Sequence, residues 1–347
     1  MNIDSAARPV ARLIVGIFLA AAIGVNVFSA PFDGNWTARI LILAACVIVP
    51  LGLRIVSLQR LGSGVDQVGR IARAAQFLCA LLLAYALLQP QGRTAALLAG
   101  SYLAATAVVA VWGLLRAWQH HRGRMGDLCI DVGLVYLAVG GFWAVLDRAG
   151  LQPLGFDPAI VLLTAVHFHY AGFTLLLLTG LAAQPGDRLS QVNCIAVVVA
   201  VPLVAVGITT TQLGFSPAIE CPVAWGMAIG GLLTAVQYFR MAFQSRWPVL
   251  MRSCWAVVAV SLVFSMWLAV LYGSRAFVPV PWLDIPWMRA LHGSANSVGV
   301  GLAGVLGWTL AAKRLVARRR RLRLRQPFQR TVKIPRRSFR KGNYLAE

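Results

Sequence analysis

Long apolar runs dominate the chain. Each is roughly 20 residues long, enough to cross a hydrocarbon core of ~30 Å as a helix. The predicted spans are residues 10–30, 38–56, 71–90, 94–115, 128–147, 158–182, 193–211, 219–240, 250–272 and 290–312. Runs such as residues 40–49 are continuously apolar and do not alternate, which excludes a membrane β-barrel. We therefore predict an all-α, polytopic bundle of about ten transmembrane helices.

The composition and the distribution of charge extend this picture. Apolar residues make up 59% of the chain and charged residues 12%, against about 25% charged residues in soluble proteins. Ten spans place both termini on one side of the membrane. The other side would carry five basic residues, namely Arg39, Arg93, Arg148, Arg275 and Arg289. The positive-inside rule then predicts that both termini are cytoplasmic, with the spans in contact with membrane lipids.

Basic residues gather after the last span. Of the 32 Lys and Arg residues, 14 lie between Lys313 and Lys341, and the net charge is +21. We divide the chain into a transmembrane domain, residues 1–312, and a basic cytoplasmic tail, residues 313–347. The position of the tail beside a span favours anionic lipid headgroups over nucleic acid as its partner, although a plain topology anchor would show the same pattern.

Small residues at helical spacing predict close packing between spans. Gly299, Ala303 and Gly307 form one such stripe, and Gly226 and Gly230 form a second. The six cysteines show no C-x-x-C spacing, so neither a disulfide framework nor a zinc site is expected.

Ionisable side chains inside the spans are few and therefore informative. Burying one in hydrocarbon costs roughly 2.5–3.5 kcal/mol, which makes a functional role the first hypothesis. His167, His169 and Tyr170 lie in the sixth span, and His292 and Asn296 lie one turn apart in the tenth. On a regular helix the two histidines of the sixth span point about 200° apart. We expect one of them in a cavity and the other bonded to a neighbouring helix.

The topology places these residues and Glu220, at the start of the eighth span, in the outer half of the membrane. Histidines and buried carboxylates exchange protons near neutral pH, which suits acid–base chemistry. The catalytic candidates are His167, His169, Glu220 and His292. The substrate-binding candidates are Tyr170, Asn296, Trp225 and Trp282.

Structural explanations of these residues stay open. The histidines could hydrogen-bond neighbouring helices, and Glu220 could be an acid favoured at a helix N-terminus. The connection carrying Pro279, Pro281 and Pro286 could be a lid or an ordinary interfacial loop. Three histidines and a glutamate match a metal-ligand inventory, but no H-E-x-x-H or related spacing is present. No metal and no cofactor are expected.

Two motifs carry a family resemblance. The segment His167-Phe-His-Tyr-Ala-Gly-Phe173, followed by Met288 and by His292-Gly-x-x-Asn296-x-x-Gly299, resembles the YndJ-like family of bacterial integral membrane proteins. The resemblance covers residues 128–312. It implies a multi-pass protein of the bacterial inner membrane and a shared intramembrane site at these histidines, Tyr170 and Asn296. It implies no particular activity or substrate.

The residues favour an integral membrane enzyme that transfers protons on a small lipid-soluble substrate, such as an isoprenoid or acyl lipid. The reaction would be a cyclisation, an isomerisation or a hydrolysis. The alternatives are a proton-coupled transporter that uses the same histidines as a relay, and a non-catalytic scaffold. A transporter requires polar residues in both membrane halves along one channel, whereas an enzyme requires a pocket that ends inside the membrane.

Overall fold

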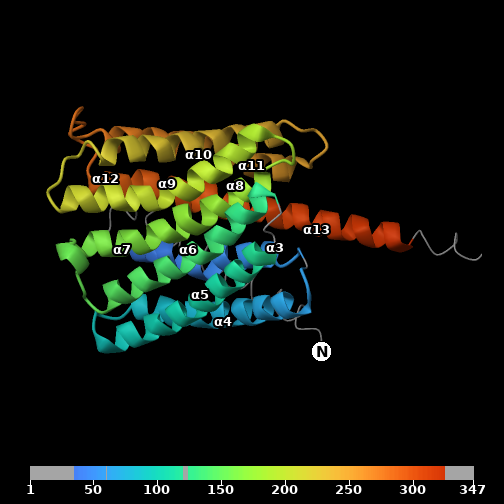
Figure 1. The fold of residues 1–347 in the computed structure, drawn as a ribbon, viewed down its shortest axis with the longest axis horizontal. Coiled ribbons are helices and arrows are strands. Elements are labelled where there is room, and N and C mark those ends of the chain that lie inside the picture. The colour runs from blue at the N-terminus through green and yellow to red at the C-terminus, as the bar shows by residue number, and fades with distance from the viewer. Residues whose placement is uncertain (1–34, 60, 120–123, 325–347) are drawn as a thin grey trace, which may run out of the picture.

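The computed structural model describes residues 35–59, 61–119 and 124–324, and every regular element in these ranges is a helix (Figure 1). Six helices in these ranges cross the bundle without interruption. In chain order they are α4 (Ser63–Leu87), α5 (Arg93–Gln119), α6 (Met125–Arg148), α9 (Arg188–Gln212), α10 (Glu220–Ala242) and α11 (Val249–Gly273).

Three further rods consist of α-helical pieces interrupted by π-helical segments. The first comprises α2 (Trp36–Leu43), η2 (Ala44–Ile48) and α3 (Val49–Val56). The second comprises α7 (Pro158–His167), η4 (Phe168–Leu175) and α8 (Leu176–Ala182), after the short 3-10 turn η3 (Pro153–Gly155). The third comprises α12 (Ile285–Trp287), η5 (Met288–Gly293), η6 (Ala295–Leu302) and α13 (Ala303–Leu324).

Eight helices in the described part of the chain are long and apolar enough to span a membrane. They match the predicted spans except two. The predicted span 10–30 lies outside the described residues. The predicted span 219–240 corresponds to α10, which has 23 residues and packs between α9 and α11 but is less apolar than the eight.

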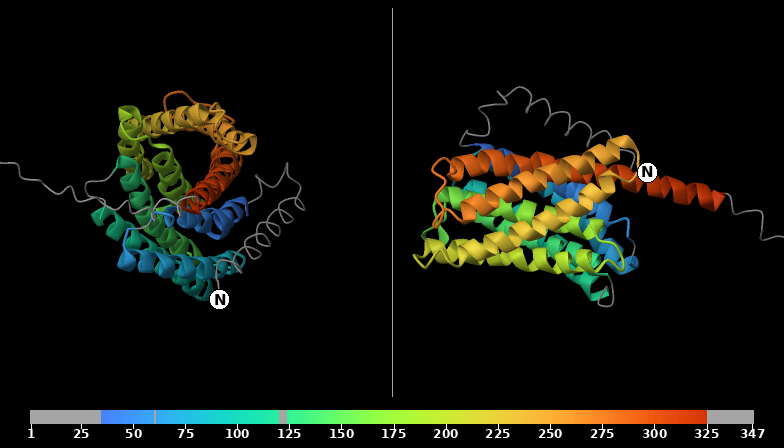
Figure 2. Two further views of the ribbon diagram at one scale, coloured as in Figure 1. Left: turned by 90° about the vertical axis from the view of Figure 1, so that its right-hand side faces the viewer. Right: turned by 90° about the horizontal axis from the view of Figure 1, so that it is seen from above.

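The rods with π-helical segments occupy the middle of the bundle. Helices α4 and α5 lie at one edge, and α10 and α11 lie at the opposite edge (Figure 1). The rods from Trp36 and from Pro158 have 67% of their apolar stretches buried, against 33% for α4, α5 and α9. Helix α13 continues past the end of the bundle (Figure 2). The central rods are therefore the ones that can hold an enclosed site.

Aspartates fix where several helices begin. Asp157 precedes α7 and accepts a hydrogen bond from Ala159 N at 2.7 Å. Asp284 caps α12 in the same way through Trp287 N at 3.0 Å. Such caps satisfy amide groups that have no partner inside the helix. Helices α5, α7, α10 and α12 all begin at one end of the bundle, which we call the proline-rich end because Pro279, Pro281 and Pro286 lie there.

The small-residue stripes are partly confirmed. A Cβ atom at Gly299 would collide with Ser261 of α11, and one at Gly307 would lie 3.0 Å from Trp255 Nε1 of the same helix. On α10, a Cβ at Gly230 would lie 2.8 Å from Val197 Cγ1 of α9. The inclusion of Gly226 was wrong, because a Cβ there meets no atom within 4 Å. Gly226 faces away from the neighbouring helices.

Candidate functional site

The three central rods contact one another through their π-helical segments. Segments η2, η4 and η6 pack pairwise in the middle of the bundle. A π-helical turn inserts an extra residue into an α-helix, and such turns are frequent at functional sites. His169 lies in η4, His167 directly precedes it, and His292 lies in a further π-helical segment, η5, so local helix distortion and candidate chemistry coincide.

His167 ends α7 and presents an unsatisfied ring nitrogen to the interior. Its Nε2 is enclosed by protein and has no hydrogen-bond partner among the described residues. His292, on η5, lies close enough for the two imidazoles to interact electrostatically. These two histidines come from different rods, and the fold brings them together.

His169 is held by both of its nitrogens. It is fully buried. Nδ1 lies 2.7 Å from the carbonyl oxygen of Ala165, and Nε2 lies 2.9 Å from the hydroxyl of Tyr102 on α5. A carbonyl oxygen can only accept, so Nδ1 carries the proton and Nε2 accepts from Tyr102. The expectation that one histidine bonds to a neighbouring helix is confirmed for His169.

Ser265 of α11 organises the second histidine. Nδ1 of His292 lies 3.0 Å from the carbonyl oxygen of Ser265 and 3.2 Å from its hydroxyl. Asn296 Nδ2 donates to the same hydroxyl at 2.5 Å and to the carbonyl oxygen of His292 at 2.9 Å. Because Nδ1 must donate to the carbonyl, Nε2 of His292 is the nitrogen with the free lone pair.

Tyr170 ties the second rod to the first. Its hydroxyl donates to the carbonyl oxygen of Ile40 at 2.8 Å. Thr174 donates to the carbonyl oxygen of His169 at 2.8 Å, five residues earlier, and so satisfies a backbone group within η4. Tyr170 therefore supports the π-helical region through a bond between rods.

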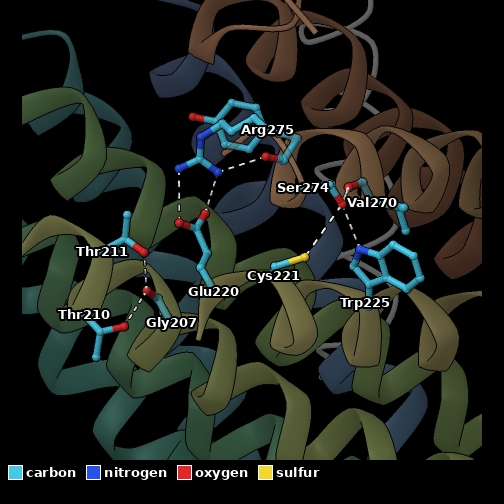
Figure 3. A network of polar contacts seen from close by, with 10 residues as sticks. Gly207, Thr210, Thr211, Glu220, Cys221, Trp225, Val270, Ser274 and Arg275 are labelled. Carbon is cyan, nitrogen blue, oxygen red and sulfur yellow. Dashed lines mark hydrogen bonds and ion pairs between the residues drawn. The ribbon is translucent and has the colours of Figure 1, made fainter. Parts of the chain in front are cut away.

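Glu220 pairs with the guanidinium of Arg275 (Figure 3). Its two carboxylate oxygens accept from Nη1 and Nη2 of Arg275 at 2.7 and 3.1 Å. Arg275 follows the end of α11, ten residues after Ser265, roughly 15 Å along a helix. Partial burial lowers the pKa of the Arg275 guanidinium, but the hydrogen bond to Glu220 and the charge interactions with Tyr272 and Glu220 together outweigh this, so that pKa lies above its ordinary value.

The predicted tryptophans lie at the proline-rich end. Trp225 is half-exposed and donates from Nε1 to the hydroxyl of Ser274 at 2.9 Å (Figure 3). Trp282 packs edge-to-face against Trp287, with ring centroids 5.9 Å apart. Neither contacts the histidines directly in the described hydrogen bonds and ring contacts.

A pocket of about 460 Å³ opens at the same end. Residues from the end of α11 and from the connection to α12 line it, including Tyr272, Arg275, Asp284 and Ile285. The proline-rich connection thus forms one wall of a pocket and is more than a plain linker.

Buried charges also occur in the opposite half of the bundle. Arg116 Nε lies 2.6 Å from Asp131, and both side chains are almost completely buried. Along α6, Leu134 and Leu137 are fully buried between Asp131 and Gly140, which packs against His169. Apolar packing therefore separates the ion pair from the histidines.

Several participants have no signature in the sequence. Tyr102, Ser265 and Arg275 contact the predicted residues, but no motif surrounds any of them: Tyr102 lies on α5, Ser265 on α11 and Arg275 just after the end of α11. Among the described residues, no three His, Cys, Asp or Glu side chains are grouped so that they could hold a metal ion.

Comparison with known proteins agrees with the motifs. The YndJ-like protein family matches residues 39–300. The uncharacterized membrane protein YndJ of Bacillus subtilis (strain 168) is 34% identical over 209 residues, which are 59% of this chain and 37% of that protein. The chain thus aligns with little more than a third of that relative. No solved structure matches the chain. This 347-residue chain is a multi-pass membrane protein and belongs to the YndJ-like family.

Proposed function

We propose that the chain is an integral membrane enzyme that performs acid–base proton transfer on a lipid-soluble substrate, in a cyclisation, an isomerisation or a hydrolysis. The observation that carries this proposal is the pair formed by His167 and His292. Nε2 of His167 is enclosed and lacks a partner, while His292 is oriented through Nδ1. A buried polar atom without a partner is costly, which supports a role in binding or chemistry.

The two histidines would divide the work. Nε2 of His292 carries a lone pair and would accept a proton from the substrate. Nε2 of His167 would donate a proton to another position of the same molecule, and the proton taken up by His292 would then pass to His167, which restores both rings. His169 and Tyr170 would act as positioning residues, because their polar atoms already bond to Tyr102, Ala165 and Ile40.

The packing around the site favours an enzyme over a transporter. A relay across the membrane would need polar groups that continue from the histidines into the opposite half. The buried pair of Arg116 and Asp131 lies there, but Leu134 and Leu137 intervene along α6. A polar site that ends inside the bundle is compatible with a reaction on a bound substrate and does not provide a path across the membrane.

We also propose that both ends of this chain face the cytoplasm, with the histidine site in the outer half of the membrane and the tail, residues 313–347, on anionic lipids. The support is the distribution of Lys and Arg among the loops. Reporter fusions after residues 60, 92, 184 and 347 test it. Cytoplasmic signals at 60, 184 and 347 and an external signal at 92 are expected, and the reverse pattern contradicts it.

The test of the enzymatic proposal compares lipid extracts from cells that carry the vector, the wild type, His167→Gln, His292→Gln or Thr309→Val. The Thr309 hydroxyl bonds only to Val305 in its own helix and serves as the matched control. Cultures receive isoprenoid and acyl-lipid precursors, and membrane levels of each variant are measured. We expect a product in the wild type and the control that falls at least tenfold in both histidine variants. Wild-type extracts that match the vector, or histidine variants that make the product normally, contradict the proposal.

A further inference from the structure

The pocket at the proline-rich end lies between that end of the bundle and the contact of Ser265 with His292. Tyr272, which lines it, is seven residues after Ser265 on α11, and Ile285, which also lines it, is seven residues before His292. Seven residues are close to two turns of the α-helix α11, so Tyr272 shares a helix face with Ser265, which contacts His292. The pocket therefore lies roughly 10 Å along α11 from Ser265, the residue that contacts His292.

Arg275 offers the pocket an unused hydrogen-bonding edge. Its Nη1 bonds to Glu220 and to the carbonyl oxygen of Tyr272, and its Nη2 bonds to Glu220. The guanidinium has five N–H groups, so the edge formed by Nε and the second Nη2 hydrogen has no bond among the described residues. Two parallel donors on one edge match the oxygens of a phosphate.

The opposite charge is present in the same pocket. Asp284 lines it, and the carboxylate uses Oδ1 to cap α12 through Trp287 N. An ionised carboxylate has about four lone-pair sites, so acceptor capacity remains for an ammonium group. A head with negative charge alone would meet two carboxylates, Glu220 and Asp284, around one guanidinium. A zwitterionic head is complementary to the pocket.

We propose that this pocket binds the head of a phosphoethanolamine-type lipid, with the phosphate on the free edge of Arg275 and the ammonium on Asp284. The lipid chains would then run toward His167 and His292. This inference rests on the proposed enzymatic function, whose substrate class it narrows from lipid-soluble molecules to zwitterionic phospholipids. Glu220 acts here as a positioning residue that fixes the orientation of Arg275.

Binding of labelled lipid to the purified full-length protein in detergent tests the inference. Phosphatidylethanolamine and phosphatidylglycerol with identical chains are titrated separately, and free phosphoethanolamine is added as a competitor. The variants are Arg275→Gln, Arg275→Lys and Asp284→Asn, in which asparagine retains the helix cap. Arg252→Gln is the matched control, because Arg252 lies at the other end of α11 and bonds to Ala242.

We expect the wild type and Arg252→Gln to bind phosphatidylethanolamine at least tenfold more tightly than phosphatidylglycerol. Arg275→Gln should lose at least tenfold in this affinity. Arg275→Lys should lose part of it, because lysine lacks the planar edge, and Asp284→Asn should lose the preference between the two lipids. Equal binding of both lipids, or unchanged binding by folded Arg275→Gln, overturns the inference. Competition by free phosphoethanolamine at the same concentration as the lipid overturns the choice of a lipid ligand.

The binding result is separable from the catalytic one. His167→Gln and His292→Gln should bind the lipid normally and form no product. Selective binding without any product would refute the proposed function and keep the pocket assignment. A product that forms equally well in Arg275→Gln would keep the proposed function and refute the assignment of the pocket.

Discussion

The hydroxyl of Tyr102 lies 2.9 Å from Nε2 of His169 and connects α5 to the central rod. The two rings are also nearly parallel, with centroids 5.7 Å apart. Together with the bond from Nδ1 to Ala165, this contact leaves His169 without a free nitrogen.

Tyr102→Phe should destabilise the protein. It removes the only donor that the described residues offer to Nε2 of His169, and an unpaired buried acceptor costs about 1–3 kcal/mol. Thermal unfolding in detergent should show a lower midpoint, whereas Tyr85→Phe should not, because Tyr85 is 56% exposed. An unchanged midpoint for Tyr102→Phe would mean that the bond does not hold His169.

Asp131→Ala should be more damaging than Glu220→Ala. Both substitutions leave an arginine without its carboxylate, but Arg116 is almost completely buried, while the Arg275 side chain is 35% exposed. Breaking a buried pair costs about 3–5 kcal/mol, and the loss should be smaller for the pair of Glu220 and Arg275, because the guanidinium of Arg275 can still reach water. The yield of monodisperse protein and its unfolding midpoint measure the difference. Equal losses in the two variants would contradict the buried position of Arg116.

Gly230→Ala and Gly226→Ala form a matched pair on α10. The new methyl group at residue 230 would lie 2.8 Å from Val197 Cγ1, whereas the one at residue 226 meets no atom within 4 Å. Overpacking costs about 1–3 kcal/mol, and alanine in an open helical position gains up to about 1 kcal/mol over glycine. Unfolding midpoints should therefore move in opposite directions, and a shift of both in the same direction would contradict the packing of α9 on α10.

Ser265→Ala should reduce turnover more than stability if His292 is catalytic. The substitution removes the hydroxyl that accepts from Asn296 and lies beside Nδ1 of His292, while the backbone carbonyl of residue 265 still accepts from that ring. We expect product formation to fall at least tenfold with lipid binding intact. Retention of full activity would show that the hydroxyl does not orient the imidazole.

The apolar runs were sufficient to predict the helices. Nine of the ten predicted spans correspond to described helices, because length and hydropathy are local properties. The π-helical segments could not be predicted, since η4 and η6 read as ordinary apolar helix in sequence. They depend on how three rods pack in space.

The candidate site was predictable in part, because an ionisable residue within an apolar run is also a local property of the sequence. His167 and His292 stand out as ionisable residues within apolar runs, and the fold brings them together. Glu220 stands out equally well, but its partner Arg275 lies 55 residues away and decides where its charge is directed. Sequence position alone does not distinguish a carboxylate aimed at a site from one neutralised beside it.

The π-helical segment Phe168–Leu175 means that the number of residues in the second rod decides which way its side chains point. Deleting one residue there would allow a regular α-helix and would rotate the two halves of the rod relative to each other by about 100°. Thr179 could then keep its bond to Thr234 only if His167 turned away from His292. The extra residue thus sets the rotation between the two halves of the rod, so that one half can contact Thr234 while the other faces His292. A family member without it would have to form one of these two contacts in another way.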